Sequence, residues 1–191
     1  MRRSTLVALS ALLLVAGCGQ QGEVADFGPG APGPDAPQLP ADRELDLGQV
    51  EVADDLPPSD AVLADAGWAE VAGWIRREVE AGRPVLVNLF ASWCDPCERE
   101  LPLLVDAANA TDDIAFLGVA HQDQRGNAQT LIDDADVAFP TLYDPFGQTA
   151  PEVGARGMPT TLVFDRDGRL AGRVMGELTE ESLGQLLDEV R

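Results

Sequence analysis

Long apolar runs in the second half of the chain predict a sheet that is buried on both sides. Residues 85–91 and 114–120 are almost continuously apolar, which is typical of parallel strands covered by helices on both faces. A third apolar run, residues 160–164, is followed by a turn sequence at 165–168 and a further strand over 169–175, which predicts an antiparallel hairpin. These segments together predict a mixed central sheet.

Helical patterns alternate with the predicted strands. Apolar residues recur three or four positions apart in residues 65–81, 98–109, 127–135 and 180–190, which predicts four amphipathic helices. A short extended segment is expected at residues 139–142. Strands that alternate with helices indicate an α/β protein, with a central mixed β-sheet flanked by helices on both faces.

The beginning of the chain has the layout of an export signal over residues 1–17. Positively charged residues open it, and the apolar run 6–16 is too short to span a bilayer comfortably. Residues 14–18 also resemble the bacterial lipobox, in which the signal is cut before a cysteine that then receives lipid. Cys18 is therefore the expected lipidation site. An ordinary cleaved signal that contains a cysteine and an uncleaved signal anchor are the alternatives.

Residues 18–58 are rich in Pro, Gly, Ala and Asp, and few of them could contribute to a core. This composition predicts a disordered tether that follows the lipidated cysteine, and leaves residues 59–191 as one folded domain. Apolar and polar residues alternate on both sides of Gly48, so a small hairpin within the tether is an open alternative.

Charge and composition exclude several functions. The chain has 33 acidic and 13 basic residues and a formal net charge of -20, so nucleic acid is not an expected partner. No lysine is present, which excludes Schiff-base chemistry. One histidine and three cysteines cannot complete a structural zinc site without carboxylates, so we expect no metal and no cofactor.

The sequence Trp93-Cys94-Asp95-Pro96-Cys97 follows directly after the predicted strand 85–91. A cysteine at the start of a helix is more easily held as a thiolate, because unpaired backbone N–H groups and the positive end of the helix dipole lie there. The pair therefore predicts a redox-active disulfide. A structural disulfide is the alternative, although so short a loop would stabilise the fold little.

Residues 93–97, the later Gly157-Met158-Pro159-Thr160-Thr161, the hairpin and the last helix together resemble the thioredoxin fold. The export signal, the tether and the long spacing from Cys94 to Pro159 are more narrowly similar to the extracytoplasmic TlpA/ResA-type thiol-disulfide oxidoreductases. The resemblance covers residues 65–191. It implies a thioredoxin-like sheet with an extra helix inserted between the half that holds the cysteines and the half that holds a cis-proline.

The resemblance also implies roles for single residues. Cys94 would be the nucleophile and Cys97 the resolving thiol, with Trp93 as an apolar docking surface, although core packing is an alternative for Trp93. A cis bond would precede Pro159 and place the backbone of Met158 beside the client. These three residues, Trp93, Met158 and Pro159, form the expected substrate-binding surface.

Two neighbours of the thiols are expected to tune them. Pro96 limits motion in the first helical turn. The negative charge of Asp95 disfavours a thiolate at Cys94, which favours a reducing over an oxidising enzyme, because a strong oxidant needs a stabilised thiolate.

Other polar residues near the site give weaker signals. Asn88 stands where thioredoxins have a buried acid, so another acid or water must move protons. His121 follows the strand 114–120 and is either a proton shuttle near the thiols or a solvated loop residue. The cluster Glu98, Arg99 and Glu100 is expected to be a solvated face.

The resemblance therefore implies a membrane-tethered disulfide reductase on the extracytoplasmic face of the cell membrane. Its partners would be disulfide-containing protein clients, with apocytochrome c as one candidate in cytochrome c maturation, and an upstream membrane electron-transfer protein. A disulfide-forming oxidase of exported proteins, a peroxiredoxin-like peroxidase and a non-catalytic binding lipoprotein are the alternatives.

Overall fold

The computed structural model describes residue 45 and residues 47–191. The predicted signal peptide, Cys18 and most of the predicted tether lie outside the described residues. Within the described part, no helix is long and apolar enough to cross a membrane.

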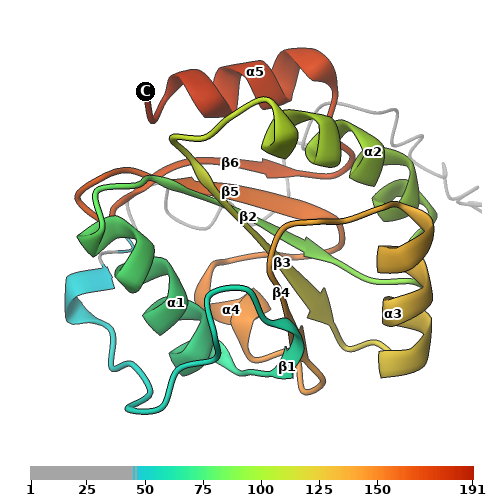
Figure 1. Cartoon of the computed structure of the whole chain (residues 1–191), viewed down its shortest axis with the longest axis horizontal. Coiled ribbons are helices and arrows are strands. Elements are labelled where there is room, and N and C mark those ends of the chain that lie inside the picture. The colour runs from blue at the N-terminus through green and yellow to red at the C-terminus, as the bar shows by residue number, and fades with distance from the viewer. Residues whose placement is uncertain (1–44, 46) are drawn as a thin grey trace, which may run out of the picture. The chain divides into compact units, whose positions relative to one another are not determined.

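A six-stranded mixed sheet forms the centre of the domain (Figure 1). Its order is β1-β4-β3-β2-β5-β6, in which β1 to β4 run parallel to one another, β5 is antiparallel to β2, and β6 is antiparallel to β5. The strands are β1 (Val62–Asp65), β2 (Val85–Phe90), β3 (Ala115–His121), β4 (Thr141–Asp144), β5 (Thr160–Phe164) and β6 (Leu170–Met175). The mixed sheet predicted from the apolar runs is confirmed.

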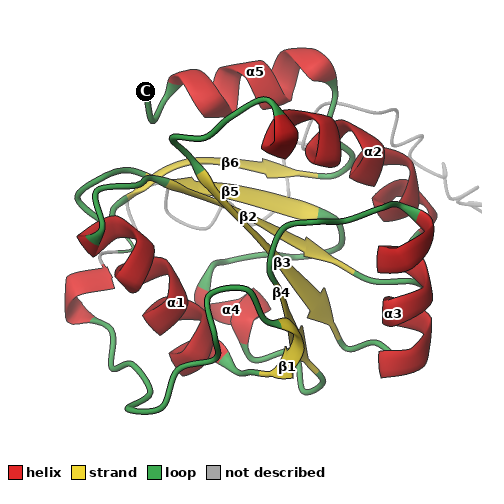
Figure 2. Ribbon diagram, viewed as in Figure 1, coloured by secondary structure: helices red, strands yellow, loops and turns green. Residues whose placement is uncertain are grey.

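Helices cover both faces of this sheet (Figure 2). They are the 3-10 helix η1 (Leu47–Gln49) and the α-helices α1 (Trp68–Glu80), α2 (Asp95–Asn109), α3 (Arg125–Asp134), α4 (Thr149–Glu152) and α5 (Glu180–Asp188). Helices α2 and α5 lie above the sheet in the view of Figure 1, whereas α1 and α4 lie below it. The segment from α3 to α4, with β4 between them, lies between the cysteine half and the proline half, where an extra helix was predicted.

Side chains that alternate along the strands separate the core into two sides. Leu117 and Val119 of β3 pack with Val71 of α1 on one side. Phe116 of β3 packs with Leu104 of α2 on the other. Because β2 is buried at all six positions, the end of this strand is a fixed point from which the next segment starts.

The domain begins earlier than the predicted boundary at residue 59. Leu47 is only 1% exposed, and its backbone N–H donates to the carbonyl of Gly168 at 3.3 Å. The guanidinium of Arg76 donates to the carbonyls of Leu47 and Val50, which holds this segment against α1. Residues 47–58 are therefore part of the packed domain and not of a disordered tether, and η1 forms where a hairpin was an alternative.

Two short elements differ from the expected pattern. Residues 62–65 form β1, although 65 onward was predicted as the start of a helix, and α1 begins three residues later at Trp68. The four-residue helix α4 was not predicted. Both elements are too short to show a period of their own, since a single turn or four-residue strand contains few apolar positions.

Candidate active site

The two cysteines lie where β2 ends and α2 begins. Cys94 is the N-cap residue of α2, with extended backbone, and its sulfur accepts the backbone N–H of Cys97 at 3.3 Å. Pro96 lies in the first turn, where its missing N–H removes no helical hydrogen bond. The sequence therefore produces a thiol that faces the positive end of a helix dipole.

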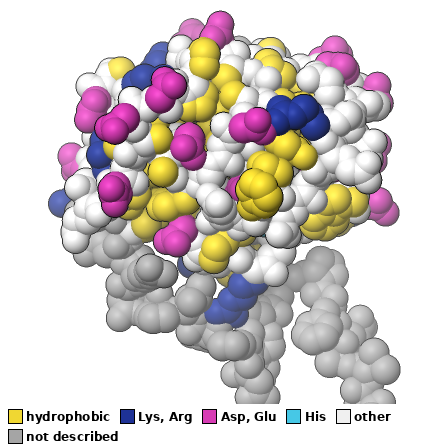
Figure 3. Space-filling view, turned by 90° about the horizontal axis from the view of Figure 1, so that it is seen from below, with side chains coloured by type: hydrophobic (Ala, Val, Ile, Leu, Met, Phe, Trp, Pro, Cys, Tyr) yellow, Lys and Arg dark blue, Asp and Glu magenta, His cyan; other side chains and the backbone are white. Residues whose placement is uncertain are grey.

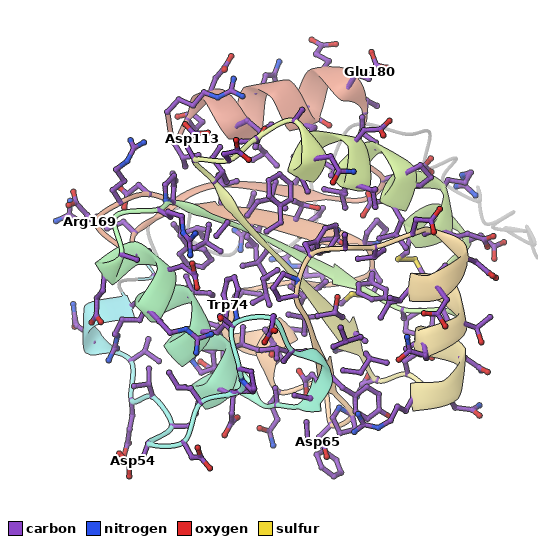
Figure 4. All side chains as sticks on the ribbon, viewed as in Figure 1. Asp54, Asp65, Trp74, Asp113, Arg169 and Glu180 are labelled. Atoms are coloured by element: carbon purple, nitrogen blue, oxygen red, sulfur yellow. A yellow bond between two sulfur atoms is a disulfide. The ribbon has the colours of Figure 1, made fainter. Side chains whose placement is uncertain are left out.

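Cys94 and Cys97 form a disulfide, the yellow sulfur bond in Figure 4. Cys94 is 6% exposed and Cys97 is fully buried, so Cys94 is the sulfur that another molecule can reach first. Both pack in one apolar cluster with Phe90 and Ala120.

Asp123, at the end of β3, holds the loop before the cysteines in place. Its carboxylate accepts the backbone N–H of Ser92 at 2.5 Å and the Ser92 hydroxyl at 2.6 Å. The hydroxyl of Tyr143 on β4 donates to the carbonyl of Asp123 at 2.7 Å. Through these bonds, the inserted β4 supports the loop that leads to Cys94.

The residues predicted to bind substrate lie around the disulfide. Trp93 is 59% exposed, so it is not a core residue, and its indole N–H donates to the carbonyl of Gln122 at 3.2 Å. The Met158-Pro159 peptide bond is cis, as the resemblance implied. The Met158 side chain packs against the cluster that contains Cys94 and Cys97. One surface thus combines an exposed indole, the outer sulfur and the cis-proline loop.

A buried acid that the sequence interpretation missed lies one helical turn after Cys97. Glu100 is 1% exposed and was expected on a solvated face. Its carboxylate accepts the amide of Asn88 at 2.7 Å and the backbone N–H of Leu178 at 2.7 Å. The signal was present in the spacing, because Glu100 lies on the same helix face as the buried Cys97 and Leu104.

Burial raises the pKa of Glu100 to about 7. The hydrogen bonds from Leu178 and Asn88 oppose this rise in pKa, while the charge of Glu177 adds to it. Asn88 stands on β2 where thioredoxins have a buried acid. Its side-chain amide instead binds the buried carboxylate of Glu100 on α2. A carboxyl group with a pKa near 7 can exchange a proton at physiological pH.

His121 does not join the thiols. It is 8% exposed and pairs across the sheet with Asp144, on the strand face that Leu117 and Val119 share with α1. Ala120, on the opposite face, is the β3 residue that packs with the cysteines. This position on the other face of the sheet argues against a proton shuttle to the thiols, and the burial of His121, which lowers its pKa, argues against a solvated loop residue.

Charges at the rim of the site are mainly acidic. Asp95 and Glu98 are exposed in the first turn of α2, and the guanidinium of Arg99 forms an ion pair with Glu177 at 2.6 Å. Among the described residues, no group of three or more Cys, His, Asp or Glu side chains is placed to hold a metal ion.

The fold and the dithiol site together define a thioredoxin-like α/β protein. The model of the AhpC/TSA family matches residues 68–173, more than half of the chain. The chain therefore belongs to the AhpC/TSA family.

Individual relatives share the same region. The chain is 33% identical over 112 residues to the thiol:disulfide interchange protein HelX of Rhodobacter capsulatus, covering 58% of this chain and 62% of HelX. It is 26% identical over 112 residues to the thiol-disulfide oxidoreductase ResA of Geobacillus thermodenitrificans, covering 58% of this chain and 64% of ResA. The chain thus spans less than two thirds of the length of these curated relatives.

A solved structure agrees with the fold. The structure of MTB dsbF in its mixed oxidized and reduced forms has a TM-score of 0.53 and 25% identity. It covers 56% of this chain and 80% of dsbF.

The raised pKa of Glu100 makes stability depend on pH in a defined direction. Between its ordinary value of 4.5 and about 7, the native state binds this proton and the unfolded state does not, so stability falls as pH rises. We expect the Glu100→Gln variant to lack this fall, which amounts to about 3 kcal/mol. Urea unfolding of the oxidised protein at a series of pH values measures it.

The matched control is Glu98→Gln, an exposed carboxylate two residues away on the same helix. This variant should retain the wild-type pH dependence, because the Glu98 side chain is exposed to solvent in the native state as it is in the unfolded chain. Wild-type and Glu100→Gln curves that stay parallel from pH 4.5 to 8 would contradict the assignment.

Proposed function

We propose that this protein is a thiol-disulfide oxidoreductase that exchanges two electrons with the disulfides of other proteins. The observation that carries the proposal is the position of Cys94 at the N-terminus of α2, with Cys97 buried one turn further on and disulfide-bonded to it. The names of HelX and ResA support this class of activity.

In the reducing direction the reaction has two steps. The Cys94 thiolate attacks one sulfur of the client disulfide, which forms a Cys94–client mixed disulfide and releases one client thiolate. The Cys97 thiolate then attacks the Cys94 sulfur, which closes the Cys94–Cys97 disulfide and releases the second client thiolate. Two electrons and two protons pass to the client, and a dithiol donor restores the enzyme.

The second step needs Cys97 as a thiolate, although this sulfur is fully buried. We propose that Glu100 accepts the proton of the Cys97 thiol, because this carboxyl lies three residues further along α2 and its pKa is about 7. Asn88 holds the acceptor in position through its amide hydrogen bond.

The charges around Cys94 support the reducing direction. The exposed carboxylates of Asp95 and Glu98 disfavour a thiolate at Cys94, whereas the nearby Arg99 is paired with Glu177. A dithiol whose thiolate is poorly stabilised gives up its electrons more readily, so the protein would act as a reductant.

We place this reductase on the outer side of the cell membrane, tethered through lipid on Cys18. The apolar run 6–16 and the lipobox-like residues 14–18 support export and lipidation. Proteins that contain a cystine are the expected clients, because Cys94 is the more exposed of the two sulfurs. The ResA-type resemblance favours the paired cysteines of apocytochrome c. A membrane electron-transfer protein would then supply electrons from the other side.

Insulin reduction by dithiothreitol tests the activity. The wild-type protein should accelerate the reaction, and Cys94→Ser should abolish the acceleration, because it removes the attacking sulfur. Cys97→Ser should accumulate mixed disulfides, whose clients mass spectrometry identifies. A wild-type protein without effect, or a fully active Cys94→Ser variant, would reject the proposal. Peroxide consumption that survives in Cys97→Ser would instead assign a peroxidase.

The reduction potential tests the direction of electron flow. We expect a value close to the roughly -270 mV of thioredoxin and far below the roughly -120 mV of a strong disulfide-forming oxidant. Asp95→Asn should raise the potential by about 10 to 30 mV, because it removes a charge that opposes the thiolate. Equilibration with glutathione measures both values. A wild-type potential near that of the strong oxidant would reverse the assignment.

Detergent phase partitioning of the full chain expressed in a bacterium tests the tether. The wild-type protein should enter the detergent phase, because lipid on Cys18 adds a long apolar chain, whereas Cys18→Ser should stay in the aqueous phase. Equal partitioning of the two proteins would contradict lipidation at this residue.

A further inference from the structure

Phe146 is the most exposed large apolar side chain in the described part of the protein, at 77%. It lies in the loop between β4 and α4, on the inserted part of the fold. A single exposed apolar residue needs no explanation, but this one is held in a tightly specified turn. Its surroundings therefore decide whether it acts as an anchor.

The turn that presents Phe146 is fixed from inside the domain. Asp144 is fully buried, and its carboxylate accepts the backbone N–H groups of Gln148 at 3.0 Å and Thr149 at 2.8 Å. Gly147 has a φ of +67°, and a Cβ at this position would lie 2.8 Å from the side chain of Gln122. The side chain of Phe146 is therefore presented on a preorganised turn.

Gln122 connects this turn to the residue next to the nucleophile. Its carbonyl accepts the indole N–H of Trp93 at 3.2 Å, and its side-chain amide donates to the carbonyl of Phe146 at 3.5 Å. Trp93, itself 59% exposed, directly precedes Cys94. Gln122 thus connects the two exposed aromatic residues, Trp93 and Phe146. The outer sulfur belongs to Cys94, the residue after Trp93.

A groove of about 530 Å³ extends from Phe146 toward the start of α1. Ala66, Pro145 and Phe146 form its apolar part, and the carboxylates of Asp65 and Glu70 lie along it. Asp65 is paired with Arg125, whereas Glu70 accepts the backbone N–H of Gly67 at 2.7 Å. Asp65 lies at the lower end of the view in Figure 4, and seen from that side hydrophobic side chains gather with acidic ones around them (Figure 3).

We infer that Phe146 and this groove form a second contact for the client, which takes a segment with an apolar side chain next to a basic one. The inference rests on the proposed function, because the client's cystine must occupy Cys94. The apolar side chain packs on Phe146, and the basic one faces Asp65 and Glu70. The net charge of -20 favours a basic segment over an acidic one.

The two contacts are separated by the surface that runs from Cys94 through Trp93 and Gln122 to Phe146. The apolar side chain that packs on Phe146 therefore lies some residues away from the client's cysteine in the client sequence. The groove thus selects clients by sequence close to, but not at, the cystine.

Single-turnover rates of the reduced full chain with mixed disulfides test this inference. The probes are synthetic peptides whose cysteine is bound to 2-nitro-5-thiobenzoate, with Leu-Arg, Ser-Arg or Leu-Glu placed at a series of spacings from the cysteine. The wild-type protein should react about tenfold faster with the Leu-Arg peptide than with the Ser-Arg peptide, as loss of an interface anchor implies. The Leu-Glu peptide should react about threefold more slowly than the Leu-Arg peptide.

The variant Phe146→Ser should lose the preference for Leu over Ser, because it removes the anchor. Val62→Ser is the matched control, since Val62 is also an exposed apolar residue, at 55%, and lies outside the groove. All three proteins should react equally with 5,5'-dithiobis(2-nitrobenzoate), which contacts the thiol alone. That small disulfide also reports whether each variant is folded and reactive.

Each other outcome overturns a separate statement. A Phe146→Ser variant that keeps the wild-type preference, or a wild-type protein without preference, rejects the groove but leaves the oxidoreductase proposal intact. A wild-type protein that reacts with every probe no faster than free cysteine rejects the oxidoreductase proposal itself. A wild-type dimer that Phe146→Ser converts to a monomer in light scattering assigns this face to a second copy of the chain.

Discussion

The carboxyl group of Glu100 joins four parts of the structure in one buried hydrogen-bonded node. It belongs to α2, accepts the side-chain amide of Asn88 on β2 and accepts the backbone N–H of Leu178 before α5. The same amide of Asn88 also donates to Thr161 on β5 at 3.0 Å. Because a buried polar group is costly without partners, these bonds fix how α2 lies on the sheet. The position of both sulfurs depends on that orientation.

This node also connects stability with chemistry. A carboxyl group with a pKa near 7 is partly neutral and partly charged at physiological pH. Burial of its charged form lowers the stability of the domain, whereas its ability to gain and lose a proton suits it for proton exchange. A purely apolar side chain at this position would satisfy the core but leave Asn88 without its acceptor. The domain thus retains a buried polar interaction one helical turn after the buried Cys97.

The parts of the fold that the sequence predicts are those with a long and regular pattern. The apolar strands β2, β3 and β5 and the cysteine-bearing helix α2 all follow from period and composition. Glu100 was missed because a charged residue was assigned to solvent by type, although its position relative to Cys97 placed it inside. Leu47 was missed because its short alternating segment follows a stretch rich in Pro and Gly, and its burial depends on contacts with Gly168 and Arg76, which are distant in the sequence. His121 was left open because sheet faces can be compared only when the strand register is known.

The hydrogen bonds of Asp123 have a consequence for how this fold can be altered. They attach the loop before Cys94 to the end of β3, on the near side of α3, so the length of α3 does not determine where the outer sulfur lies. Because Ala128 and Ile132 of α3 pack in the same cluster as both cysteines, an exchanged helix would have to keep these apolar contacts. New specificities can therefore be grafted onto the exposed face of α3 without rebuilding the thiol pair.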